Sequence, residues 1–162
     1  MDERIYYSEL KRPRFCKFLW AVLFVSAVIF GSVFVQMLFT DFSYLGLSIL
    51  ALVFLLVNFV LILVTWAFDR YFINVTQNNM AFGYSHWNTS LDVEKISSIE
   101  QVDIRWVKWG GMGWRVRAGK KIGYITGNGA GVGLLIDGGR YYEFNCDNPQ
   151  ALIECIGSEN GK

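Results

Sequence analysis

The stretch of this sequence that most resembles a phosphate-binding loop is a run of four alternating glycines, Gly127, Gly129, Gly131 and Gly133. A dinucleotide fingerprint requires G-x-G-x-x-G at a strand-to-helix junction, where backbone N–H groups converge on the pyrophosphate. No register supplies this pattern, because the sixth position counted from Gly127, Gly129 or Gly131 is Val132, Leu134 or Ile136. We therefore predict that Gly127, Gly129 and Gly131 form a turn and a close approach between two strands. An anion nest built from turn N–H groups is the alternative for residues 127–133.

Catalytic chemistry has little support in the sequence. His86 is the only histidine, and no nucleophile elbow, zinc-binding pair or carboxylate-dense stretch accompanies it. The three cysteines have unrelated spacings and give no metal pattern. We therefore expect no enzymatic activity, no cofactor and no metal. The competing hypothesis, an enzyme acting on a lipid or nucleotide, requires His86 and a carboxylate to converge in one pocket.

One charged segment is distinctive, because every charged side chain between Asp103 and Asp137 is basic. Three tryptophans and a methionine are interleaved with these cations at residues 106–114. Cations and amphipathic rings together suit the membrane–water boundary, and each basic residue near an anionic leaflet contributes about 1 kcal/mol of binding. We predict lipid or partner contact for Arg105, Lys108, Trp109, Trp114, Arg115, Arg117, Lys120 and Lys121.

The alternative for this segment is a solvated strand pair whose tryptophans lie in the core. Nucleic acid is disfavoured as a partner, because the net charge of the chain is only +1 and the basic run is short.

A long apolar region precedes this segment. From Phe18 to Phe68 the only Asp, Glu, Lys or Arg is Asp41. Each half exceeds the roughly 20 residues that a helix needs to cross a ~30 Å hydrocarbon core. The sequence therefore predicts two transmembrane helices joined by a turn at residues 40–43. The first is too long for the apolar region of a signal peptide and lacks a cleavage site.

Basic residues flank the predicted helices and are absent from the turn that joins them. They are Arg4, Lys11, Arg12, Arg14 and Lys17 before the first helix and Arg70 after the second. Cytoplasmic flanks of transmembrane helices carry an excess of Lys and Arg. Both termini are therefore expected in the cytoplasm.

The remainder, residues 69–162, reads as a small β domain. Segments rich in β-branched and aromatic residues occur at 70–77, 80–84, 99–106, 114–118, 122–126, 132–136 and 141–145. Hairpin turns are predicted at residues 78–79, 118–121 and 137–139, where Asn, Asp and Gly tolerate positive φ angles. Pro149 fits the first position of a terminal helix. The expected fold class is α+β, with a transmembrane hairpin followed by an antiparallel partial barrel or sandwich that a C-terminal helix closes.

Three segments carry a resemblance that covers the whole chain: FDRYFINVT, LDVEKISSIEQV and GAGVGLLIDGGRYYEFNCDNPQALIECI. The chain resembles bacterial membrane proteins with two transmembrane helices and a C-terminal bacterial pleckstrin-homology-like domain. The resemblance implies an integral protein of the bacterial cytoplasmic membrane with a binding or scaffolding role. The expected divisions are a basic cytoplasmic segment at 1–17, the hairpin at 18–68 and the domain at 69–162.

The function expected from these observations is a non-enzymatic, membrane-anchored interaction module. It would present its cytoplasmic domain to a membrane-protein partner or to a second copy of itself. The alternative is a sensor of anionic lipid headgroups that uses the basic and aromatic segment at residues 105–121.

A polar residue lies deep in the second apolar helix. An unpaired Asn58 amide is costly in lipid, so it should face protein. Counted outward from the turn, the residue at matching depth is Ser26, next to the small pair Ala27 and Gly31. We predict that Ser26, Ala27 and Gly31 line the helix–helix seam, and that Asn58 hydrogen-bonds across it or to a second protomer.

Overall fold

The computed structural model describes residues 5–40 and 44–160, which form two compact units. One unit is the helical hairpin Cys16–Ala67. The other, the β domain, combines residues 5–15 with residues 68–160. The hairpin is therefore inserted into the β domain, and the domain is built from both flanks of the apolar region.

The hairpin consists of α1 (Arg14–Leu38) and α2 (Tyr44–Phe68). Both helices are long and apolar enough to cross a membrane, by length and composition. Each helix contributes one polar residue to the seam between them. The Ser26 hydroxyl donates to Asn58 Oδ1 at 2.8 Å, and Asn58 Nδ2 donates to the Phe54 carbonyl at 2.9 Å. The amide of Asn58 is thus satisfied within this hairpin.

Two of the residues expected in the seam lie elsewhere. Ala27 is exposed, and a Cβ added at Gly31 would meet nothing within 4 Å. The seam instead contains Phe30, whose ring stacks on Phe54 with 3.9 Å between centroids. Ser26 and Phe30 share one helix face, whereas Ala27 and Gly31 lie on a face rotated by about 100°. Aromatic stacking therefore replaces the predicted approach of small residues.

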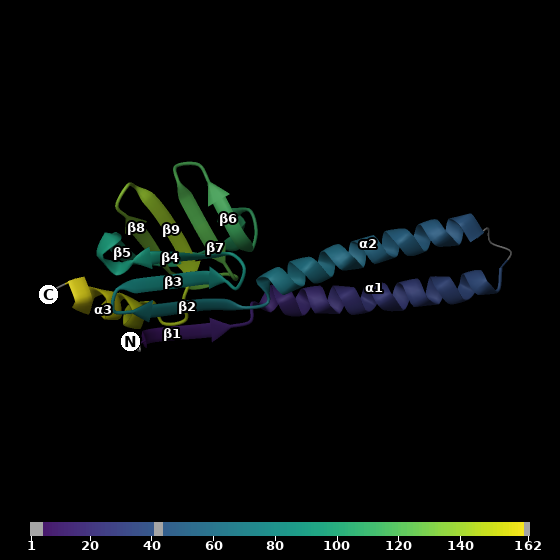
Figure 1. Cartoon of the computed structure of the whole chain (residues 1–162), viewed down its shortest axis with the longest axis horizontal. Helices are drawn as coiled ribbons and strands as arrows, with labels where there is room; N and C mark the ends of the chain where they lie inside the picture. Colours follow the sequence, from purple (N-terminus) through teal and green to yellow (C-terminus); the bar gives the residue numbers. More distant parts are fainter. Residues whose placement is uncertain (1–4, 41–43, 161–162) are drawn as a thin grey trace. The chain divides into compact units, whose positions relative to one another are not determined.

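The β domain contains two sheets (Figure 1). The first has the order β1-β2-β3-β4 and is antiparallel throughout. Its strands are β1 (Ile5–Lys11), β2 (Tyr71–Thr76), β3 (Asn79–Tyr84) and β4 (Asn88–Asp92). The short helix η1 (Val93–Lys95) leads from β4 into the second sheet.

The second sheet has the order β5-β8-β9-β7-β6. Its strands are β5 (Ile96–Ile104), β6 (Gly113–Arg117), β7 (Lys121–Ile125), β8 (Gly129–Ile136) and β9 (Arg140–Asn145). The short helix η2 (Trp106–Trp109) follows β5, and α3 (Pro149–Asn160) ends the described chain. The β7–β9 pair is parallel, which differs from the wholly antiparallel sheet that the sequence predicted.

The β domain does not begin at residue 69 as expected, because residues 5–15 also belong to it. Residues 1–17 were expected to form a separate basic segment, but β1 pairs with β2 from Ile5↔Thr76 to Lys11↔Tyr71, with one shift of register between Ile5 and Tyr7. A strand before the first apolar helix and a strand after the second are thus hydrogen-bonded neighbours. The domain is discontinuous in sequence because its first edge strand precedes the hairpin.

The core of the domain receives side chains from both sheets and from α3. Phe82 of β3 stacks on Phe144 of β9 with 4.3 Å between ring centroids. Leu134 of β8 and Leu152 of α3 are fully buried in the same cluster. This shared core identifies the two sheets and the terminal helix as one folded unit, in agreement with the predicted α+β class.

The glycine-rich segment has the strand-packing role that the sequence favoured. A Cβ at Gly131 would lie 2.5 Å from the Phe144 carbonyl oxygen and against the Ile104 side chain. A Cβ at Gly133 would overlap the Tyr141 hydroxyl. Gly129 has φ of +134°, a region that side chains rarely permit. Gly127 differs, because a Cβ there would meet nothing within 4 Å.

Candidate functional site

The predicted basic and aromatic segment spans η2 and the β6–β7 hairpin. β6 is the outermost strand of the second sheet and, among the described strands, pairs only with β7 (Figure 1). We call the exposed residues of this strand the β6 edge; they are Trp114, Arg115, Val116 and Arg117. Trp114 is 43% exposed and Val116 is 59% exposed. The β6 edge therefore offers apolar and cationic side chains beside one unpaired edge of backbone.

Trp109, which the sequence placed on the contact surface, is a core residue. It is 6% exposed and packs with Ile104 and Ile125. Its Nε1 donates to Glu143 Oε2 at 2.8 Å. The ring covers Gly123, where a Cβ would lie 2.7 Å from the indole. Because η2 turns this indole inward, Trp109 is unavailable to a partner.

The remaining cations do not form a single patch. The guanidinium of Arg117 lies over the Trp109 ring at 5.6 Å, and Lys121 Nζ lies 5.2 Å from the centroid of Tyr141. Lys120 Nζ donates to the Gly138 carbonyl at 3.4 Å. Arg105 pairs with Asp103 at 3.4 Å. The structure thus places Arg105 immediately before η2, the exposed Lys108 within η2, and the others along the β6–β7 hairpin.

A second feature was not predicted from the sequence. A cleft of about 840 Å³ opens on the β domain, and four separate stretches of chain line it. The lining residues are Lys11, Arg12, Arg14, Phe15, Trp106, Met112, Thr126, Gly127, Asn128, Gly129, Ala130, Asn145, Cys146 and Asp147. The sole histidine, His86, lies in the turn between β3 and β4 and does not line this cleft.

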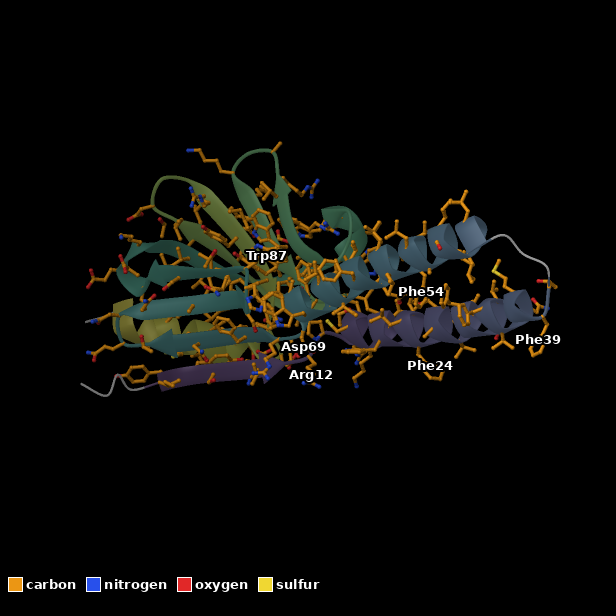
Figure 2. The ribbon with its side chains drawn as sticks, turned by 45° about the vertical axis from the view of Figure 1, so that its right-hand side comes forward. Arg12, Phe24, Phe39, Phe54, Asp69 and Trp87 are labelled. Carbon is orange, nitrogen blue, oxygen red and sulfur yellow. The ribbon has the colours of Figure 1, made fainter. Side chains whose placement is uncertain are left out.

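Three cations, from the end of β1 to the first residue of α1, line the cleft. Lys11 Nζ lies 2.8 Å from both Glu9 Oε1 and Asp147 Oδ1. The guanidinium of Arg12 lies 3.5 Å from Asp69 Oδ2, and Figure 2 shows these two side chains together. Within residues 5–40 and 44–160, Arg14 makes no ion pair or side-chain hydrogen bond. Of these three cations, Arg14 is therefore the one whose guanidinium has no ionic partner among the described residues.

The glycine-containing turn between β7 and β8 lines the same cleft. Asn145 Oδ1 accepts from the Thr126 N–H at 2.7 Å, and Asn128 Oδ1 accepts from the Trp106 N–H at 3.0 Å. These bonds tie both ends of the turn to the sheet and to η2. The N–H groups of Gly127 and Asn128 have no acceptor among the described residues. Two consecutive backbone donors thus remain available in a turn whose position is fixed.

A buried polar network supports the cleft at the β1 end. The Tyr7 hydroxyl donates to Glu9 Oε2 at 3.0 Å and lies 3.3 Å from Cys146 Sγ. The Asp147 N–H donates to Glu9 Oε2 at 3.1 Å. Burial raises the pKa of Cys146 to about 11 and is also the main cause of the raised pKa of Tyr7. Although burial opposes it, hydrogen bonds to Asp147 and Glu9 raise the pKa of Lys11.

The sequence held one signal for this network. Tyr7, Glu9 and Lys11 alternate along β1, so they point to the same side of the strand. The neighbouring basic residues obscure this alternation, because they give the whole stretch the composition of a membrane flank.

Comparison of the chain with protein-family models, with curated proteins and with solved structures finds no match.

Proposed function

We propose that this protein is a non-enzymatic, membrane-anchored interaction module whose β domain binds a membrane-protein partner. The observation that carries the proposal is the insertion of the apolar hairpin between paired strands β1 and β2. Because Lys11 and Tyr71 are register partners, the chain leaves and re-enters the domain at one place. A membrane crossed by both helices then has both flanks of the hairpin on the same side.

The basic flanks favour the cytoplasmic side, and the resemblance favours a bacterial cytoplasmic membrane and a pleckstrin-homology-like domain. Two stacked sheets followed by a C-terminal helix support that domain assignment.

The surface that best suits a partner is the β6 edge. An unpaired outer strand can accept another strand through its free backbone groups, and the exposed side chains then select the sequence that binds. Arg115 and Arg117 favour an acidic extended segment. Antiparallel pairing of β6 with a second copy centred on Arg115 would place this guanidinium opposite itself, which is destabilising. A different, acidic chain is therefore the better partner.

Site-specific cross-linking tests this proposal. A photoreactive residue at Val116, in the full chain and in native membranes, should give one discrete adduct. The matched control is Ser98 on β5, an exposed position on the opposite outer strand of the same sheet. R115E/R117E should abolish the adduct at position 116. Equal adducts at both positions, or an adduct insensitive to charge reversal, would contradict the proposal. An adduct of twice the chain mass would identify a second copy as the partner.

Anionic lipid headgroup binding by residues 105–121 is a second candidate, favoured by the exposure of Trp114 beside Arg115. In nanodiscs, anionic lipid should then slow hydrogen exchange along β6, and salt should reverse the effect. Equal exchange in neutral and anionic nanodiscs would remove this candidate.

A further inference from the structure

We infer that the cleft of the β domain is a binding site for a phosphate group, held by Arg14 and Arg12 together with the Gly127 and Asn128 N–H groups, which line the same cleft. The site is distinct from the β6 edge. The inference rests on the proposed membrane anchoring only where the phosphate belongs to a lipid.

The cleft has the size and lining of a ligand site. Its volume of about 840 Å³ lies within the roughly 300–1,000 Å³ of small-molecule pockets. All of its lining residues belong to the β domain. Phe15, Met112 and the 40% exposed Trp106 add apolar surface beside the cations. This combination suits a phosphate carried on an apolar group better than a free inorganic ion.

The charges available in the cleft favour an anion. The one acidic side chain in the lining is Asp147, and its Oδ1 is engaged by Lys11. Arg12 is 67% exposed and its contact with Asp69 is long at 3.5 Å, so its guanidinium retains donors for a ligand. Arg14 has no ionic partner among the described residues. Arginine is suited to phosphate because its planar donors match two oxygens at once.

The turn supplies the second half of the site. Consecutive backbone N–H groups without acceptors form concavities that bind anions. Among the described residues, the N–H groups of Gly127 and Asn128 have no acceptor. The Thr126 N–H is held by Asn145, and the Asn128 side chain accepts from the Trp106 N–H. No side chain at residue 127 obstructs the approach. The donors are therefore oriented before the ligand arrives, which lowers the entropic cost of binding.

The test uses the full chain in nanodiscs of neutral phosphatidylcholine, with the amide signals of Gly127 and Asn128 followed by NMR. In one arm inorganic phosphate is titrated. In the other, phosphatidic acid replaces part of the lipid. Shifts of these two amides in either arm are expected. A response to inorganic phosphate alone assigns the site to soluble phosphates, and a response to phosphatidic acid alone assigns it to lipid headgroups.

Arg14→Gln is the diagnostic variant, because this side chain has no ionic partner whose loss would disturb the fold. It should weaken the response roughly tenfold, as expected for loss of a charge-assisted bidentate contact. The matched control Arg140→Gln removes the same charge from an exposed position on β9, outside the cleft lining and outside the β6 edge, and should leave the response unchanged. No amide shift in either arm, or equal weakening by both variants, would overturn the inference. Because this test uses no residue of the β6 edge, the two proposals can fail independently.

Discussion

Lys11, the last residue of β1, is the register partner of Tyr71, the first residue of β2, and its Nζ lies 5.5 Å from the centre of the Tyr71 ring. The two residues are separated in sequence by the entire apolar hairpin. Between this strand pair and the helices, the two chain segments are also joined by the ion pair between Arg12 and Asp69. The hairpin is thus held at its base by a strand ladder, so the domain requires both of its flanks.

Removal of the hairpin should leave a folded domain if β1 is kept. We expect a chain in which a short glycine-containing turn joins Arg12 to Asp69 to be soluble and to unfold cooperatively. Residues 69–162 alone should be strongly destabilised, because they lose β1 and uncover Tyr71 and Val75. The loss should be a large share of the 5–15 kcal/mol typical of a domain. Urea unfolding followed by circular dichroism compares the two chains. Equal midpoints would show that β1 adds no stability.

The Ser26–Asn58 hydrogen bond should contribute modestly to the hairpin. Couplings of this type average about 0.6 kcal/mol, so Asn58→Leu should be mildly destabilising. A double-mutant cycle with Ser26→Ala, measured by unfolding in bicelles, isolates the coupling. Ser32→Ala is the control, since its hydroxyl donates only to the Val28 carbonyl of its own helix. A coupling energy of zero would contradict an internal bond.

Two glycines of the alternating run should respond differently to the same substitution. Gly131→Ala places a methyl group against the Phe144 carbonyl and the Ile104 side chain, so the strands must move. We expect a loss of about 1–3 kcal/mol in unfolding free energy, as for other overpacked sites. Gly127→Ala is the matched control, because its Cβ enters open space. Thermal unfolding of both variants measures the difference, and equal losses would refute the close approach.

Alkaline pH should destabilise the β domain first through Cys146. Burial raises the pKa of this thiol from an ordinary value of 9.0 to about 11, so the unfolded chain loses the proton first. Its stabilising contribution is complete below pH 9 and is lost as the pH rises toward 11. The groups that act on the thiol are the Tyr7 hydroxyl, the Glu9 carboxylate and the backbone of Asn148. Free energies of unfolding between pH 8 and pH 10 should decline in the wild type.

Cys146→Ala provides the control for this pH dependence. The decline between about pH 9 and pH 10 should become shallower in this variant, whereas the steeper loss above pH 10 should persist because burial also raises the pKa of Tyr71 and Tyr124. Identical profiles for the two proteins would show that Cys146 does not titrate on unfolding.

The parts of the fold that could be predicted are those with local signals. The hairpin between β8 and β9 was predicted because Gly138 and Gly139 permit positive φ angles, which both adopt. β4 was missed because its sequence NTSLD is polar and only Leu91 and Thr89 turn inward. β1 was missed because its pairing partner lies beyond two helices, and no local pattern announces so distant a pairing.

The candidate site shows the same limit. The glycines of the turn and the cations before α1 were each visible in the sequence, but their meeting in one cleft depends on the β1–β2 ladder and on η2. Trp109 illustrates the converse error, because a tryptophan among cations reads as a surface anchor. Its burial is decided by Gly123 and Glu143, which belong to other strands.

The β1–β2 ladder also imposes an order on biosynthesis. The N-terminal strand leaves the ribosome first, yet its hydrogen-bonding partner is translated only after α1 and α2. Until then β1 is an unpaired strand tethered to a nascent apolar helix. Pairing β1 with β2 closes a loop that contains α1 and α2, and closing a flexible loop costs conformational entropy. This entropic cost is smaller if the two helices have already formed a compact hairpin. Synthesis of both helices thus precedes completion of the sheet, and a folded β domain reports that α1 and α2 have been translated and that β2 has returned to pair with β1.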